Sequence, residues 1–220
     1  MNNAPYRVLD CPDYKMINSE LLDYVNKYTN LLTNDPHAPD YNPMNHPVYC
    51  NFPDKFGHSI IHFIKSNPSL INWCANMGMI LRDAYFTLAW SLTSKVSSTC
   101  ATAEANESSC PIHVDKPPVY WKLNWPILNM EHTAIRFYEL KDKTIDMQTL
   151  ITRGGNPASK DRDHYNLKYK DFVEMDRHRF DSNPIIMNGM VPHDIGFYEN
   201  PVFPRIGLQG MFFKEPIHLL

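Results

Sequence analysis

Two histidines, one aspartate and one arginine have the types and the order of a metal centre that binds an acid. His113 and Asp115 are separated by one residue, and His193 follows after a long interval. Two histidines and a carboxylate can occupy one face of an octahedral iron(II) ion and leave three positions open. Arg205, beyond His193, can hold a carboxylate with two parallel hydrogen bonds. These residues predict an iron site that accepts a keto acid and dioxygen.

Each of these residues also has a plainer interpretation when it is taken alone. Most histidines are surface or core residues, so His113 by itself is a weak indication of a metal. Asp115 suits a turn or a helix cap, and Arg205 suits a surface ion pair that contributes little to stability. The metal site is favoured because all four residues occur together, in order, in strand-like surroundings.

The pattern resembles that of the iron(II)- and 2-oxoglutarate-dependent oxygenases: His-x-Asp, a long gap, a histidine, then an arginine. Segments 120–129 and 205–209 are similar to small members common in phages and marine microbes, and the resemblance covers about residues 85–213. It implies that His113, Asp115 and His193 are the catalytic iron(II) ligands. Arg205 then pairs with the far carboxylate of 2-oxoglutarate, and the reaction with O2 releases carbon dioxide and succinate.

The expected reaction is hydroxylation of a small molecule or an amino-acid side chain. Four other arginines are rival partners for the 2-oxoglutarate carboxylate, but Arg205 is preferred because it begins the last expected strand, as in the family. The rivals are Arg136, Arg153, Arg177 and Arg179. The substrate, the oxidative outcome, the oligomeric state and the loop that closes the site stay open; candidate loops are 35–56, 93–110 and 153–166.

Asn124 is a second candidate for binding the cosubstrate. It interrupts an apolar strand, and a buried amide needs hydrogen-bond partners. It could bind the keto acid, or it could satisfy a backbone bulge before Pro126. Lys122 is expected to face solvent or the rim of the site, and Trp121 and Trp125 to lie in the core. The last expectation concerns three histidines in polar text that should be solvated: His132, His164 and His178.

Net charge argues against two classes of partner. The chain has 220 residues and a formal net charge of -3, which gives no general attraction to nucleic acid or to an acidic membrane. A nucleobase or nucleic-acid hydroxylase is therefore the less favoured alternative, supported only by a local basic cluster. A non-catalytic, cupin-like metal-binding jelly roll is a further alternative. The basic cluster is Lys160, Arg162, Lys168 and Lys170.

No signal peptide or membrane span is expected. The N-terminus lacks a basic region followed by an apolar run, and the most apolar segment, 71–92, is interrupted by polar residues. The five cysteines are odd in number and include no Cys-x-x-Cys, which favours reduced thiols and a cytoplasmic location. A bridge between Cys100 and Cys110 is a minor alternative. His58 and His62 share a helix face but lack the glutamate of a zinc peptidase motif.

Proline and hydrophobic periodicity predict a mainly β chain with helices near its N-terminus. Eighteen prolines against eight glycines suit short strands and stiff connections. Apolar spacing predicts helices in the first third of the chain and strands in the remainder. The helices are expected at 16–32, 57–66 and 68–81, and the strands at 84–91, 119–128, 133–140, 144–152, 184–190 and 205–213. Segment 167–173 is ambiguous.

The expected fold class is therefore α+β, mainly β. Short strands with turn signals suggest an antiparallel barrel or jelly roll with helices on one outer face. The family resemblance implies the double-stranded β-helix form of that fold. A chain of this length can form one domain, 1–220, with residues 1–83 as a helical and loop support and 84–213 as the catalytic core.

Overall fold

The strands of the chain form two antiparallel sheets. The computed structural model describes residues 4–33, 48–50, 60–89, 108–115, 121–147, 164–167, 169–197, 202 and 205–219. The six-stranded sheet has the spatial order β1 (Tyr6–Val8), β9 (Ile185–Asn188), β5 (Trp121–Leu128), β11 (Arg205–Phe212), β3 (Leu81–Ala89) and β2 (Val48–Cys50). The five-stranded sheet has the order β7 (His164–Asn166), β4 (Ser108–Asp115), β10 (His193–Phe197), β6 (Thr133–Leu140) and β8 (Phe172–Arg179).

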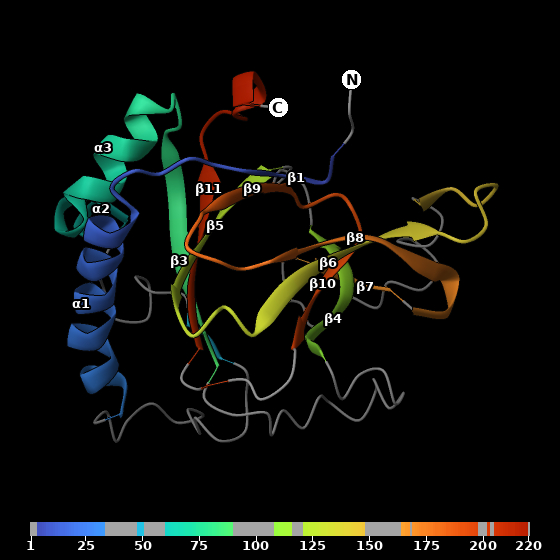
Figure 1. The fold of residues 1–220 in the computed structure, drawn as a ribbon, viewed down its shortest axis with the longest axis horizontal. Helices are drawn as coiled ribbons and strands as arrows, with labels where there is room; N and C mark the ends of the chain where they lie inside the picture. The colour runs from blue at the N-terminus through green and yellow to red at the C-terminus, as the bar shows by residue number, and fades with distance from the viewer. Residues whose placement is uncertain are drawn as a thin grey trace.

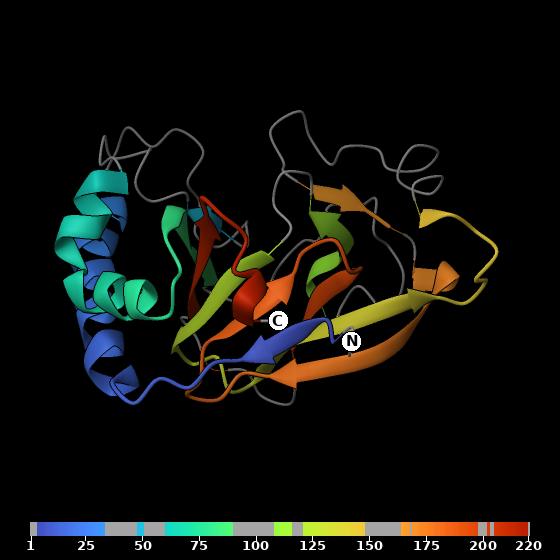
Figure 2. The same ribbon diagram turned by 90° about the horizontal axis from the view of Figure 1, so that it is seen from above.

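Three helices cover the outer face of the six-stranded sheet (Figures 1 and 2). They are α1 (Tyr14–Thr33), α2 (Ile60–Ser66) and α3 (Pro68–Asn76). The apolar stripe predicted for α1 is confirmed, since Ile17, Leu21 and Val25 are buried against the sheet. Two single-turn 3-10 helices are η3 (Tyr169–Asp171) and η4 (Ile217–Leu219).

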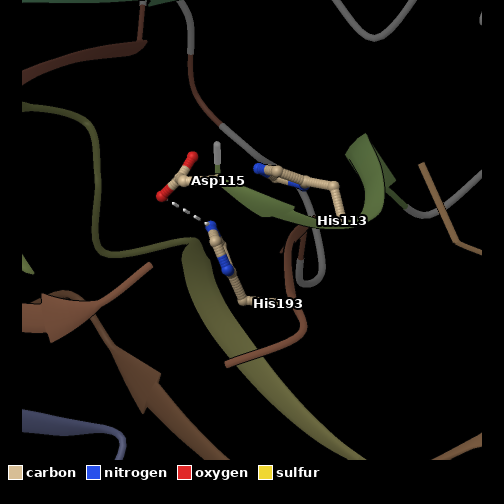
Figure 3. Close-up of side chains that lie close together, drawn as sticks. All are labelled: His113, Asp115 and His193. Carbon is tan, nitrogen blue, oxygen red and sulfur yellow. Dashed lines mark ion pairs between the residues drawn. The ribbon is translucent and has the colours of Figure 1, made fainter. Parts of the chain in front are cut away.

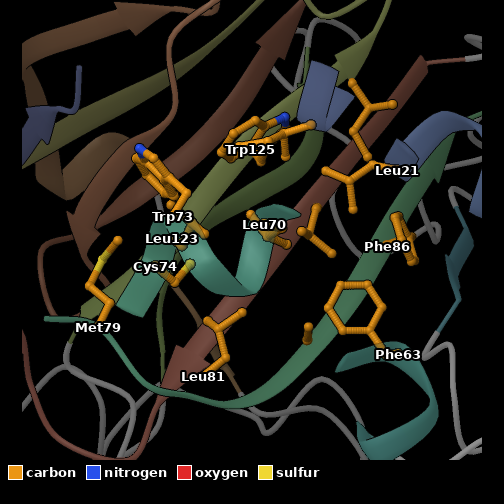
Figure 4. Close-up of a cluster of buried hydrophobic side chains, with 14 of the residues drawn as sticks. Leu21, Phe63, Leu70, Trp73, Cys74, Met79, Leu81, Phe86, Leu123 and Trp125 are labelled. Carbon is orange, nitrogen blue, oxygen red and sulfur yellow. The ribbon is translucent and has the colours of Figure 1, made fainter. Parts of the chain in front are cut away.

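The main core lies between these helices and the sheet (Figure 4). Trp125 of β5 is fully buried there, and its ring meets the ring of Trp73 edge-on at a centroid distance of 5.3 Å. Tyr14 stacks on the same indole at 5.4 Å, and the indole N–H of Trp125 donates to Asn18. Burial of each large apolar side chain contributes about 1.5–3 kcal/mol, so this cluster fixes β5 firmly. The core placement expected for Trp125 is confirmed.

A second cluster packs the two sheets face to face. Ile135, Phe137 and Ile195 come from the five-stranded sheet, while Ile185 and Met187 come from β9 of the other sheet. The arrangement is that of a mainly β, two-layered molecule with few helices. A third, smaller cluster covers the outer face of the five-stranded sheet; it contains Ile112, Tyr138, Leu140 and Phe172.

β5 is buried on both of its faces. Leu123 and Trp125 point toward the helices, so Lys122 and Asn124 must point toward the five-stranded sheet, because side chains alternate along a strand. Lys122 was expected to face solvent or the rim of the site; the solvent alternative is wrong, since its exposed fraction is 4%. The second face of β5 is covered by another sheet and not by water.

Several element boundaries differ from the sequence-based prediction. The helix expected to reach Leu81 ends at Asn76, because Gly78 adopts a positive φ of 69° and Leu81 already begins β3. The strand expected at 144–152 is wrong over its described part, since residues 141–145 form turns and bends and residues 146 and 147 are not in a strand. The ambiguous segment becomes η3 and the start of β8, and β10 was not predicted.

The N-terminal region also contributes to the sheets. β1 and β2 lie where no strand was predicted, and they extend the two edges of the six-stranded sheet by pairing with β9 and β3. Cys11 and Cys74 are buried free thiols. The side chains of Cys100 and Cys110 lie outside the described residues, as do most of the polar loops at 35–56, 93–110 and 153–166. Among the described helices, none is long and apolar enough to cross a membrane.

Candidate metal centre

His113, Asp115 and His193 come together at one end of the five-stranded sheet (Figure 3). His113 and Asp115 lie two residues apart on β4, so their side chains share a face. β10 runs antiparallel to β4 with His193 directly opposite His113. All three side chains are buried, and one ligand atom from each lies within 4.8 Å of the others. Two strands thus bring together ligands that are far apart in sequence.

The spacing of these atoms is close to what one ion requires. Ligand atoms that bind one ion at about 2.1 Å are at most about 4.2 Å apart. His193 Nε2 and Asp115 Oδ2 are 3.9 Å apart, which is already inside that limit. The centroids of the two imidazole rings are 4.3 Å apart with a tilt of 51°. Small side-chain rotations are enough to gather the three atoms around one ion.

The ring of His193 is held in one orientation by the backbone. Its Nδ1 lies 2.8 Å from the carbonyl oxygen of Val191. Because a carbonyl oxygen only accepts, Nδ1 donates this hydrogen bond, and Nε2, the ring nitrogen nearest Asp115, is the atom left to face an ion. Histidines that bind metals in proteins are usually oriented by such a hydrogen bond from the other ring nitrogen.

Asp115 Oδ2 is a buried oxygen that accepts no hydrogen bond within the described part of the chain. The side chain is pressed against Gly189, where an added Cβ would lie 2.1 Å from Oδ2. The backbone N–H of Asp115 donates to the carbonyl oxygen of Gly189 at 2.8 Å. The carboxylate is therefore fixed in place with a lone pair available, which fits a cation.

Lys122 contacts the candidate ligand Asp115, whereas the sequence suggested at most a contact at the rim of the site. Its Nζ lies 2.7 Å from Asp115 Oδ2, and both side chains are almost completely buried. The contact is a charge contact and not a well-formed hydrogen bond, since Oδ2 has no hydrogen-bond partner among the described residues. The sequence signal for burial of Lys122 was its position between Trp121 and Trp125, which were both expected to lie in the core.

Arg205 and Asn124 extend the polar surface along the inner face of the six-stranded sheet. Arg205 has an exposed fraction of 3%, and its Nε donates to the hydroxyl of Thr133 at 3.2 Å. Asn124 is equally buried, and its amide nitrogen has no partner among the residues described. Gln209, the cross-strand neighbour of Asn124, is also buried. The register of Asn124 with Gln209 is regular, and the irregularity in this strand pair lies between Pro126 and Leu128.

The rival arginines have other positions. Arg136 forms a two-point ion pair with Asp194 on the outer face of the five-stranded sheet, with Nε–Oδ1 and Nη2–Oδ2 distances of 2.8 and 2.5 Å. Arg177 and Arg179 are exposed on β8, where Arg177 pairs with Glu174. Arg153 lies outside the described residues. Among the described arginines weighed for this role, Arg205 is the one on the inner side of a sheet.

Asp194 is held by three side chains on the outer face of the sheet, next to the candidate ligand His193. Besides Arg136, the hydroxyls of Tyr138 and Tyr169 donate to its Oδ2 at 3.1 and 2.5 Å. Burial, followed by the Asp194 charge, raises the pKa of Tyr138 well above its usual range. Burial alone would lower the pKa of Arg136, but the hydrogen bonds and charge of Asp194 raise it. These contacts of Asp194 on the outer face of the sheet hold β10 in place, and with it the neighbouring residue His193.

The remaining histidines lie apart from this centre. His178 was expected to be solvated, but it is buried between Tyr6 and Phe180 at ring-centroid distances of 5.0 and 5.6 Å. β8 carries it inward because Ile135, its cross-strand neighbour, faces the second core cluster. His132 is partly exposed, as expected. The side chains of His58, His62 and His164 lie outside the description.

Comparison with known proteins adds no family assignment: no protein-family model matches the chain, and no curated protein matches it. The geometry of the site therefore carries the functional argument. Two imidazole nitrogens and one carboxylate oxygen on adjacent strand ends form a donor set suited to iron(II), and also to manganese(II).

Proposed function

We propose that the chain is a non-haem iron(II) enzyme that uses 2-oxoglutarate and O2 to hydroxylate a small molecule or an amino-acid side chain. The observation that carries the proposal is the buried convergence of His113, Asp115 and His193, with an oriented histidine and an available carboxylate oxygen. Iron bound there would supply the place where 2-oxoglutarate and dioxygen react. The three residues would hold the ion with one nitrogen or oxygen atom each, and such a set can leave positions for both reactants.

We further propose that the two sheets form a jelly roll of the double-stranded β-helix type. In chain order, the central strands are β3, β4, β5, β6, β8, β9, β10 and β11. The first pairs with the last, the second with the seventh, the third with the sixth and the fourth with the fifth. These nested pairs alternate between the two sheets, a strand order that supports a jelly roll.

The position of Arg205 supports its role as the partner of the far carboxylate. Arg205 donates a hydrogen bond to Thr133, and Thr133 pairs with Phe197. Phe197 is the last residue of β10, and His193 is the first. His193 and Phe197 are four residues apart on β10, which corresponds to about 13 Å at 3.3 Å per residue. A five-carbon diacid and the long arginine side chain together can bridge such a span. The guanidinium then offers two parallel hydrogen bonds to a carboxylate.

Asn124 is proposed as the second group that binds the keto acid. Its amide nitrogen is a buried donor that has no acceptor among the described residues, and leaving such a group unsatisfied costs about 1–3 kcal/mol. A carboxylate or keto oxygen of the cosubstrate would remove that cost. The interior position of Asn124 and Arg205 also excludes water, which strengthens both interactions.

Anaerobic titration tests the proposal. Iron(II) and then 2-oxoglutarate are added to the metal-free protein, and the visible charge-transfer band of a chelated keto acid is monitored. We expect the band in the parent protein and in the control His132→Ala, a partly exposed histidine, and no band in His193→Ala. Iron binding without a band would contradict the 2-oxoglutarate assignment and favour a cupin-like metal protein. Absence of metal binding would contradict the metal centre itself.

A further inference from the structure

Lys122 places a buried positive charge at the metal centre from the opposite sheet. β5 belongs to the six-stranded sheet, whereas Asp115 and the histidines belong to the five-stranded sheet. The ammonium group reaches across the space between the sheets to within 2.7 Å of Asp115 Oδ2. That oxygen also lies nearest to His193 Nε2, at 3.9 Å. The atom expected to bind the ion is therefore the atom that the lysine contacts.

We propose that Lys122 competes with the metal for the Asp115 carboxylate and thereby sets the metal affinity of the centre. This inference rests on the proposed function, because it assumes that Asp115 is a ligand. In the metal-free protein the lysine balances the charge of the buried carboxylate. When a divalent cation binds the same oxygen, the ammonium group and the ion share one negative charge.

Competition outweighs orientation because Asp115 is positioned without the lysine. Its backbone N–H is bonded to the Gly189 carbonyl oxygen at 2.8 Å. Its side chain occupies the space that a Cβ on Gly189 would fill, since that atom would lie 3.0 Å from Cγ and 3.1 Å from Cβ of Asp115. Backbone and packing thus fix the carboxylate. The contribution that Lys122 alone makes at this oxygen is its charge.

Burial makes that charge effective. The lysine and aspartate side chains have exposed fractions of 5% and 11%, so water screens their contact poorly. Removal of one partner from a buried ion pair leaves the other as an uncompensated charge. In Lys122→Met, the Asp115 carboxylate is that uncompensated charge, and a metal ion is what can neutralise it. The metal-free form loses stability while the metal-bound form loses an unfavourable repulsion, so metal affinity rises.

The same arrangement couples the metal to an anion. With Lys122 present, a divalent ion brings two further positive charges beside an ammonium group. An anionic ligand at the open positions relieves that repulsion, so 2-oxoglutarate should tighten metal binding in the parent protein. Without the lysine there is less repulsion to relieve, and the tightening should be smaller. Coupling between two ligands is reciprocal, so metal should tighten 2-oxoglutarate binding by the same factor.

The test is calorimetric titration of manganese(II), an air-stable probe for the same donor set, with and without 2-oxoglutarate. The parent protein is compared with Lys122→Met and with Lys122→Gln, which keeps a hydrogen-bond donor but no charge. Outer-shell partners change metal affinity by about 10–100-fold, so we expect Lys122→Met to bind manganese at least about 10-fold more tightly. Lys122→Gln, which lacks the charge as well, should also bind manganese more tightly than the parent. Lys143→Met, which removes an exposed lysine paired with Glu139, is the control for net charge and should match the parent.

The outcomes separate this inference from the proposed function. Equal or weaker manganese binding in the lysine variants, with their circular dichroism unchanged, overturns the competition while leaving the metal centre intact. An equal 2-oxoglutarate effect in all proteins overturns the coupling. Failure of every protein to bind manganese removes both proposals. Manganese binding by the lysine variants but not by the parent supports the competition in its strongest form. If Lys122→Met does not fold, the manganese affinity of Lys122→Gln decides between these outcomes.

Discussion

Asp115 and Asp194 lie on opposite faces of the same sheet and have opposite surroundings. Asp194 is fully buried on the outer face and receives hydrogen bonds from Arg136, Tyr138 and Tyr169. Asp115 is nearly as buried on the inner face, yet its Oδ2 has no hydrogen-bond partner in the part of the structure that is described. A neighbouring lysine provides charge but leaves that oxygen able to bind a cation.

The difference separates a structural carboxylate from one that is available to a ligand. A buried carboxylate whose oxygens are all satisfied can stabilise the fold but offers nothing to bind. A buried carboxylate that is incompletely satisfied reduces stability, and proteins tolerate such groups mainly at functional sites. Sequence composition does not distinguish the two residues, because both are aspartates next to or near a histidine.

The largest expected effect follows from removal of the structural carboxylate. Asp194→Ala leaves Arg136 as a partly buried, unpaired charge and removes the acceptor of two tyrosines. Loss of one partner of such a pair costs about 3–5 kcal/mol in unfolding free energy. Urea unfolding measures the loss, with the exposed Glu131→Ala as a control that should stay within about 0.5 kcal/mol. A loss below about 1 kcal/mol would contradict the structural role.

Gly189→Ala should damage the available carboxylate specifically. The added Cβ would lie 2.1 Å from Asp115 Oδ2, so the carboxylate must leave its present position beside His193. We expect manganese affinity to fall about 10–100-fold, with about 1–3 kcal/mol of stability lost to overpacking.

Gly210→Ala is the matched control for this substitution. Its added Cβ would lie 2.8 Å from a Leu81 methyl group, on the core side of β11. It should lower the unfolding free energy by a similar amount without changing metal affinity. Equal loss of metal binding in both variants would mean that general destabilisation is responsible.

Asn124→Leu tests whether an unsatisfied buried donor marks the cosubstrate site. Hydrogen bonds to charged groups contribute about 1.5–3 kcal/mol, so 2-oxoglutarate affinity should fall at least about 10-fold. Manganese affinity in the absence of the keto acid should stay within about twofold, because Asn124 is not one of the three proposed ligands. Calorimetry of both ligands gives the answer. Unchanged 2-oxoglutarate binding would assign Asn124 to the fold.

His178 provides the smallest and most discriminating test, because its Nε2 is also buried without a hydrogen-bond partner among the described residues. It is not part of the metal-ligand cluster found in the described chain. Burial lowers the pKa of His178, although the charges of Asp181 and Asp176 oppose that shift. His178→Phe should therefore leave manganese affinity unchanged, which would show that an unsatisfied atom needs converging ligands to form a site.

The pH dependence of stability should identify the same histidine. Because the folded pKa lies below the ordinary value of 6.5, the unfolded chain binds the proton first as pH falls. The contribution of neutral His178 is complete above about pH 6.5 and is lost as pH decreases below it. Between pH 7.5 and 5, His178→Phe should lose less unfolding free energy than the parent, by under about 1 kcal/mol. Equal losses in both proteins would contradict this assignment.

The sequence was sufficient for the strands that have two distinguishable faces. β6 begins and ends where the pattern predicts, and β5, β9 and β11 were located within a few residues. His113, Asp115 and His193 were identified from type and order, and the structure brings them together. Their function as ligands and the role of Arg205 stay predictions. Local patterns succeed here because each of these strands carries its own alternation and its own turn signals.

The contacts across the two sheets could not be predicted from the sequence. Lys122 looks like a solvated residue until the register places β5 opposite Asp115. β8 was missed because its outer face carries charged residues and its inner face is only partly apolar. Gly189 has an ordinary negative φ or extended backbone, so only the nearby carboxylate explains why it has no side chain. Such requirements depend on residues distant in sequence, which no local pattern contains.

The position of β11 has a consequence for the order of folding during synthesis. This strand, at 205–212, lies in the middle of the six-stranded sheet, with β3 and β5 as its neighbours. A ribosome-bound chain that lacks it has two sheet fragments with open inner edges, so the layers cannot close. The long sequence separation between these partners predicts slow folding. The nascent chain should therefore depend on protection of those edges until β11 has emerged.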